Sequence, residues 1–172
     1  MLKPLIAGLL AAMLLTGCAT IVRALSGSEH AHDYPESAAY AVSDDAMADV
    51  EAALVRAYEL DKRVLLVMGA NWCHDSRALA GWLETPRFAK LIEAEYELIF
   101  VNIGMPQMGD GHNLHVARRF GLDELPGTPN LLVLTSEGEP LNLDTATSWR
   151  NAASREEDAI YGELEMLARK PA

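Results

Sequence analysis

The chain has 172 residues, of which 50% are hydrophobic and 23% charged, and its formal net charge is −11. This length and composition are typical of a globular protein with one domain and a sizeable core. The acidic balance and the lack of a Lys/Arg cluster argue against a nucleic-acid partner, because neutralising phosphates requires concentrated positive charge.

Residues 1–18 have the pattern of a signal peptide. Lys3 supplies a positive charge, and the apolar stretch from Leu5 to Leu15 is too short to span a bilayer as a mature helix. The stretch ends in Leu15-Thr16-Gly17-Cys18, which resembles a bacterial lipobox. This resemblance implies cleavage before Cys18 and attachment of lipid to its sulfur. The alternative is an ordinary signal peptide with an incidental cysteine.

We therefore expect a protein of the bacterial cell envelope that is lipid-anchored through Cys18 and faces the periplasm. Ala19, and not Asp, follows the cysteine, which by analogy with enteric lipoproteins favours the outer membrane. The sequence contains two cysteines, so Cys73 would be the only thiol of the mature protein once Cys18 carries lipid.

The segment 19–42 contains Ser, Gly, His, Glu, Asp and Pro without a sustained period, which predicts a flexible tether. Within it, Glu29 to Asp33 includes two histidines, but a solvated linker explains this composition and we assign no metal site there. The folded domain is expected over residues 43–172.

This domain is predicted to begin with an amphipathic helix. Met47, Val50, Leu54 and Tyr58 recur at spacings of three and four, behind the capping sequence Ser43-Asp44-Asp45. The apolar face of the helix is expected to lie on a sheet.

A buried strand follows and leads to a cysteine. Val64 to Met68 are five consecutive apolar residues, the run breaks at Gly69, and apolar residues recur at helical spacing from His74 to Leu83. Cys73 thus stands where a helix starts, facing its unpaired N–H groups and positive dipole end, which favours the reactive thiolate over the thiol. A buried structural cysteine is the alternative.

The remaining elements predict an α/β order with a parallel crossover and a hairpin. The expected elements are a helix restarting at Thr85-Pro86, a strand over Leu98–Ile103, a loop over Gly104–Gly111, a short helix over 114–120, strands over Asn130–Thr135 and Pro140–Leu143, and a last helix opened by a capping box at Ser154 and Glu157.

The residues around Cys73 resemble the thioredoxin superfamily, whose sites read Trp-Cys-x-x-Cys after a hydrophobic strand. The matching stretch is Ala70 to Ser76, and Gly127-Thr128-Pro129 stands where this family places a cis-proline beside its cysteine. Glu84–Phe88, followed by Tyr96–Val101, looks most like the branch that includes the C-terminal domain of the transmembrane disulfide reductase.

This resemblance implies a thioredoxin-like fold, with a four-stranded mixed β-sheet between α-helices and without the usual first strand. Two residues depart from the family pattern. Ser76 stands in place of the second, resolving cysteine, and Val67 stands where classical thioredoxins bury a proton-transferring aspartate. Both departures weigh against ordinary dithiol reduction.

The candidate catalytic residues are Cys73, Ser76 and His74. Ser76 is expected either to bond the Cys73 sulfur or to be an exposed serine in the first helical turn. A protonated His74 would stabilise the thiolate, whereas Asp75 would oppose it, so the residues alone leave the net direction open.

The candidate substrate-binding residues are Trp72, Thr128 and Pro129. Trp72 is expected to form a surface wall beside the thiol, with core packing as the alternative. The resemblance implies that the Thr128 backbone pairs with an extended substrate segment. His112 and His115 are expected to be solvent-facing helix residues.

These features predict monothiol thiol–disulfide exchange through Cys73, with thiol- or disulfide-containing envelope proteins or small thiols as partners and without a cofactor. A different class is a non-catalytic thioredoxin-like binding or chaperone module, which Val67 and Ser76 both favour. Metal handling through Cys73 and His74 ranks last, because no cysteine/histidine ligand spacing supports it.

Overall fold

The computed structural model describes residues 34–171. The predicted signal peptide, Cys18 and residues 19–33 of the predicted tether lie outside the described residues. No helix in the described range is long and apolar enough to cross a membrane.

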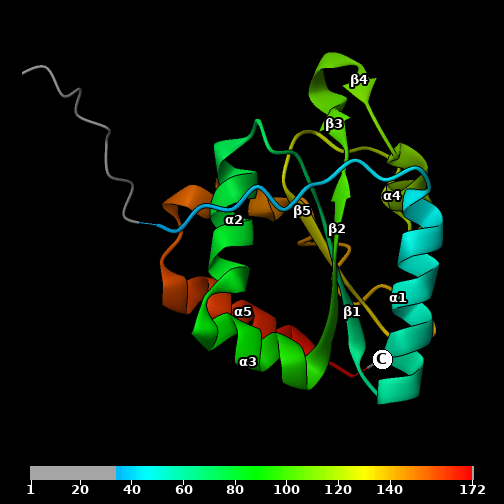
Figure 1. The fold of residues 1–172 in the computed structure, drawn as a ribbon, viewed down its shortest axis with the longest axis vertical. Helices are drawn as coiled ribbons and strands as arrows, with labels where there is room; N and C mark the ends of the chain where they lie inside the picture. The colour runs from blue at the N-terminus through cyan, green and yellow to red at the C-terminus, as the bar shows by residue number, and fades with distance from the viewer. Residues whose placement is uncertain (1–33, 172) are drawn as a thin grey trace, which may run out of the picture. The chain divides into compact units, whose positions relative to one another are not determined.

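The described chain forms a mixed α/β structure (Figure 1). Its elements are α1 (Ala46–Leu60), β1 (Arg63–Gly69), α2 (His74–Glu84), α3 (Pro86–Glu95), β2 (Tyr96–Asn102), β3 (Gly104–Met105), the 3₁₀ helix η1 (Pro106–Met108), β4 (Asp110–Gly111), α4 (Leu114–Arg119), β5 (Asn130–Leu134), the 3₁₀ helix η2 (Ser148–Ser154) and α5 (Glu157–Arg169).

The main sheet has the strand order β2-β1-β5. β1 runs parallel to β2, from the pair Arg63↔Tyr96 to the pair Gly69↔Asn102, and antiparallel to β5. The first pairing is the predicted parallel crossover. Figure 1 shows α2, α3 and α5 on one side of this sheet and α1 and α4 on the other.

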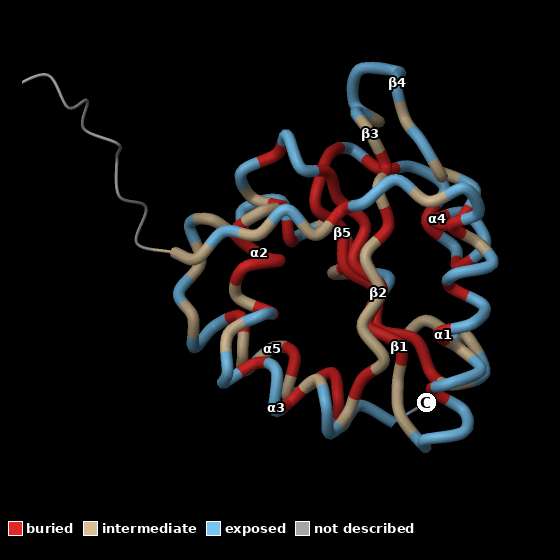
Figure 2. The backbone as a smooth tube through the Cα atoms, viewed as in Figure 1, coloured by how far each residue is buried: buried red, intermediate tan, exposed pale blue. Residues whose placement is uncertain are grey.

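Alternate residues of β1 enter the two hydrophobic cores. Leu65 and Val67 belong to the cluster that includes α2, α3 and α5, whereas Leu66 and Met68 belong to the cluster under α1 and α4. β1 is buried from Val64 to Gly69 (Figure 2), as predicted from its continuous apolar run, and only its first residue, Arg63, is partly exposed.

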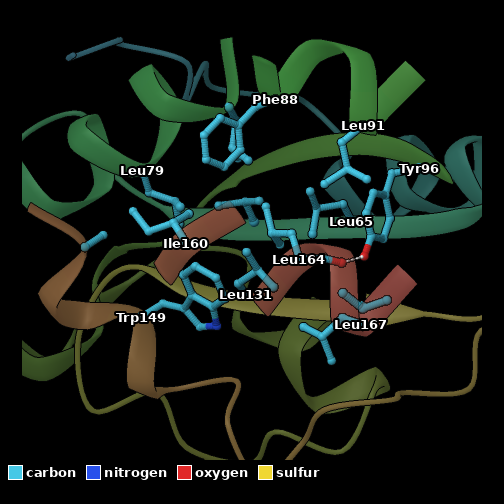
Figure 3. Packing of buried hydrophobic residues seen from close by; sticks show 14 of the residues in the cluster. Leu65, Leu79, Phe88, Leu91, Tyr96, Leu131, Trp149, Ile160, Leu164 and Leu167 are labelled. Atoms are coloured by element: carbon cyan, nitrogen blue, oxygen red, sulfur yellow. Dashed lines mark hydrogen bonds between the residues drawn. The ribbon is translucent and has the colours of Figure 1, made fainter. Parts of the chain in front are cut away.

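The first of these clusters is closed by α5 (Figure 3). Ile160, Leu164 and Leu167, at spacings of four and three on one face of the helix, point into it. The buried Tyr96 hydroxyl donates a hydrogen bond to the Leu164 carbonyl at 2.6 Å, which satisfies its polar group inside the core.

The predicted fourth strand is reduced to a single bridge between Leu134 and Pro140. Beyond this bridge, the Asn142 side chain makes the hydrogen bonds that a strand backbone would otherwise make. Its Oδ1 accepts from the Val133 N–H at 2.8 Å and its Nδ2 donates to the Leu131 carbonyl at 3.0 Å. This side chain completes the hydrogen bonds of β5 after the backbone has turned away, so the sheet has three strands and not four.

The predicted tether also needs correction, because residues 34–42 pack on the domain as a strap. The domain therefore includes residues 34–42 and does not begin at residue 43. Within the strap, Tyr40 is 1% exposed, the Ser37 N–H donates to the Arg77 carbonyl at 3.0 Å, and Glu36 pairs with Arg77. In the described range, no strand precedes α1.

The predictions made for the first and last helices were confirmed only in part. Asp45 caps α1 by accepting from the Ala48 N–H at 3.0 Å, as predicted. Tyr58, predicted to face the sheet, is 69% exposed. The capping box of α5 does not form, because the helix begins after Glu156 without a side-chain cap, while the Ser154 hydroxyl donates to a carbonyl in η2.

Candidate functional site

Cys73 is the N-cap residue of α2. β1 ends at Gly69, and a tight turn follows in which the Cys73 N–H donates to the Ala70 carbonyl at 3.1 Å. The turn places the thiol at the positive end of an 11-residue helix. Cys73 is buried, with 7% of its area exposed, which agrees in burial with the alternative of a buried cysteine.

The second wall of the site is the segment before β5. Antiparallel pairing joins Met68 to Asn130, and this places the start of β5 beside the end of β1. The Thr128–Pro129 peptide bond is cis, as the resemblance implied. The Thr128 carbonyl accepts from the Cys73 Sγ at 3.5 Å, so the structure brings these two predicted site residues together.

Trp72 lies at the surface with 46% of its area exposed, so the alternative of core packing is wrong. Its Nε1 donates to the Gly104 carbonyl at 3.0 Å, which links the cysteine turn to the β3–β4 hairpin. Met105 and Met108 of this segment are also exposed, at 37% and 75%. An apolar rim therefore adjoins the residue that precedes the thiol.

Ser76 differs from both predictions made for it. It is fully buried, and its hydroxyl accepts from the Ala70 N–H at 3.3 Å and does not bond the Cys73 sulfur. The reason is the tight backbone at Gly69, where an added Cβ would lie 2.8 Å from the Ser76 Oγ. Ser76 thus holds the turn that carries the cysteine.

Tyr40 is the site residue that sequence reasoning missed. Its hydroxyl donates to the Ser76 carbonyl at 3.1 Å, and its backbone N–H and carbonyl pair with the Asn71 side chain at 3.0 and 3.1 Å. Burial raises the pKa of Tyr40 far above its ordinary value, and the nearby Cys73 thiolate raises it further. The hydroxyl therefore stays neutral. The sequence gives only a weak signal, since Tyr40 is one of two tyrosines in the segment 34–42.

His74 faces solvent. Its side chain is 64% exposed and lies 3.2 Å from the Asp75 carboxylate. The other Asp75 oxygen accepts from the Ala153 N–H at 2.8 Å, which ties the first turn of α2 to η2. His112 and His115 are both exposed, as predicted, but only His115 lies in a helix, because α4 begins at Leu114. The His112 Nε2 lies 3.5 Å from the Asp110 Oδ1.

Val67 is buried in the hydrophobic cluster, so no carboxylate occupies the position behind the thiol where classical thioredoxins bury an aspartate. Across residues 34–171, no group of three or more His, Cys, Asp or Glu side chains is arranged to hold a metal ion. The chemistry available at this site is that of the Cys73 sulfur.

The fold and the site define a thioredoxin-fold protein with a single cysteine at the start of its active-site helix. A family model described as thioredoxin-like matches residues 45–136, which is more than half of the chain, and the chain belongs to this family.

Among solved structures, the chain is similar to the disulphide isomerase from Xylella fastidiosa Temecula1, with 28% sequence identity and a TM-score of 0.69. The match covers 77% of this chain and 98% of that chain. No curated protein matches the chain significantly.

Proposed function

We propose that this protein performs monothiol thiol–disulfide exchange through Cys73. The observation that carries the proposal is the placement of the sulfur at the N-terminus of α2 and 3.5 Å from the Thr128 carbonyl, next to Pro129. Membership of the thioredoxin-like family and similarity to a disulphide isomerase support exchange chemistry in general.

The proposed reaction has two steps. The Cys73 thiolate attacks one sulfur of a substrate disulfide, the substrate S–S bond breaks, and a mixed disulfide forms while the other substrate sulfur leaves as a thiolate. Ser76 has no sulfur with which to displace the bound partner. A second thiolate, from the substrate or from a small thiol, must therefore release it, and the sequence of steps gives no net oxidation.

The mixed disulfide is directly measurable. Incubation of the purified, processed protein with 2-hydroxyethyl disulfide should give one adduct by intact mass, whereas Cys73→Ser should give none. The adduct should persist in buffer and disappear when a thiol is added. Absence of an adduct on the wild type would end the exchange proposal.

The binding or chaperone module remains the second candidate, because the Cys73 side chain is only 7% exposed while Trp72 and the neighbouring methionines present an apolar rim. Refolding of a protein with scrambled disulfides separates the two functions. If the protein exchanges disulfides, Cys73→Ser should lose its effect on refolding. If the protein only binds polypeptide, the Cys73→Ser variant should assist refolding as well as the wild type does.

We also propose that the protein is anchored to the envelope through lipid on Cys18 and faces the periplasm, with the outer membrane as the favoured site. The sequence pattern of residues 1–18 supports this. Thiol- or disulfide-containing envelope proteins and small thiols would then be within reach of Cys73.

A further inference from the structure

Arg150 lies on η2, a segment that contacts both walls of the thiol site. η2 is tied to the first turn of α2 by the bond between the Ala153 N–H and Asp75. Arg150 itself lies against Gly127, in the other wall. A Cβ added at Gly127 would be 3.1 Å from the Arg150 Cδ and 4.0 Å from its Nη1.

Gly127 immediately precedes Thr128, whose carbonyl contacts the Cys73 sulfur at 3.5 Å. The missing side chain at Gly127 allows the stem of Arg150 to lie along the backbone at this point. A guanidinium is thereby held beside the segment that faces the thiol, although the two residues are distant in the sequence.

The guanidinium is anchored but not neutralised. The Arg150 Nε donates to the Thr147 carbonyl at 2.9 Å, and among the described residues no carboxylate pairs with Arg150. By contrast, Arg77, Arg87 and Arg155 all have carboxylate partners. Arg150 is also exposed, so its remaining N–H groups are open to an anion.

We propose that Arg150 binds the carboxylate of a small thiol or disulfide that exchanges with Cys73, which makes carboxylate-bearing small thiols the preferred exchange partners. This inference rests on the exchange function proposed above. A planar guanidinium matches a carboxylate in geometry as well as in charge. A small ligand agrees with the burial of Cys73, which is 7% exposed. The need for an outside thiol follows from Ser76.

Arg150 acts only on binding and orientation in this scheme. The Cys73 thiolate attacks a symmetric disulfide, the substrate S–S bond breaks, one half becomes bound to Cys73, and the other half leaves as a thiolate. Other charged groups near the cysteine turn include the His74–Asp75 pair and Arg77, which donates to the Asn71 carbonyl and pairs with Glu36, and all of these are unchanged in the test below.

The test uses three symmetric disulfides of similar length: dithiodipropionic acid, 2-hydroxyethyl disulfide and cystamine, which are anionic, neutral and cationic. The rate of adduct formation on the purified protein is followed by intact mass. We expect Arg150→Ala to lower the ratio of anionic to cationic rates at least threefold relative to wild type. Arg150→Glu should lower it further, and Arg150→Lys should retain part of it.

Arg169→Ala is the matched control, because it removes the same unit of charge from an exposed arginine that is paired with Glu165 on α5. Its ratio should equal that of the wild type. High salt should reduce the wild-type preference, since exposed charges are screened.

Equal rate ratios in wild type and Arg150→Ala, or equal losses in Arg150→Ala and Arg169→Ala, would overturn the assignment of Arg150 while leaving exchange at Cys73 intact. Failure of all three disulfides to modify the wild type would instead overturn the exchange function and this inference with it. Thermal unfolding of each variant checks that the exposed substitution leaves the fold unchanged.

Discussion

Two glycines in helix interiors test whether the strap of residues 34–42 lies on the domain. Gly81 is in α2, and a Cβ there would clash with the Pro35 carbonyl group and lie 2.7 Å from the Glu36 nitrogen. Gly162 is in α5, and a Cβ there would meet nothing within 4 Å. The two sites therefore share a helical backbone and differ in what covers them.

Alanine is favoured over glycine in a helix interior by about 1 kcal/mol. Gly162→Ala should stabilise the protein by about that amount. At Gly81 the same gain is opposed by overpacking against backbone atoms, which costs about 1–3 kcal/mol. The strap cannot yield freely, because the Ser37 N–H bonds the Arg77 carbonyl and Glu36 pairs with Arg77. Gly81→Ala should thus be less stable than Gly162→Ala by about 1–3 kcal/mol.

Urea unfolding of both variants and the wild type measures this difference. If Gly81→Ala instead detaches the strap, its m-value should fall, because the native state would already expose surface that normally becomes exposed on unfolding. Equal stabilisation by the two substitutions would refute the packing of residues 34–42 on α2 and restore the tether boundary at residue 43.

Four further outcomes are expected. Asn142→Ala should lower the free energy of unfolding by about 2–4 kcal/mol, since two buried backbone groups of β5 lose their partner; a loss below about 0.5 kcal/mol in urea unfolding would contradict its strand-like role. Tyr40→Phe should cost about 0.5–1.5 kcal/mol in the same assay, through loss of the bond to the Ser76 carbonyl, and an unchanged stability would argue against that bond. Ser76→Cys should expel a partner bound to Cys73 by closing an internal disulfide, at a stability cost of about 1–3 kcal/mol because the larger sulfur enters a filled site; a glutathione adduct that lasts as long as on the wild type would show that the two positions cannot react. Cys18→Ala should abolish labelling by a fatty-acid analogue in cells, and equal labelling of the variant would refute lipid attachment at this residue.

Local patterns in the sequence determined the elements that bring Cys73 to a helix start. The apolar run Val64–Met68, the break at Gly69 and the helical spacing after His74 each depend on neighbours a few residues apart. For that reason β1, the turn and α2 appear in the structure as predicted. The family resemblance was likewise confirmed, since a thioredoxin-like family model matches residues 45–136.

Predictions were wrong where a side chain's partner lies far away in the sequence. The exposure expected for Ser76 followed from its place in a first helical turn, but the Tyr40 strap covers it from 36 residues away. The fourth strand was expected over Pro140–Leu143 as the second arm of a hairpin, but Asn142 satisfies β5 with its side chain. Neither outcome has a periodic signal, since each arises from one residue.

The position of Arg150 is the clearest example of this division. The sequence by itself determined that Cys73 is a candidate nucleophile, because a cysteine between Trp72 and a helix start has a local chemical meaning. Only the tertiary structure decided that Arg150 lies against Gly127, in the wall that contacts the sulfur. The physical reason is that the helix N-terminus is created by adjacent residues, whereas the contact of Arg150 with Gly127 depends on how η2 packs between α2 and β5.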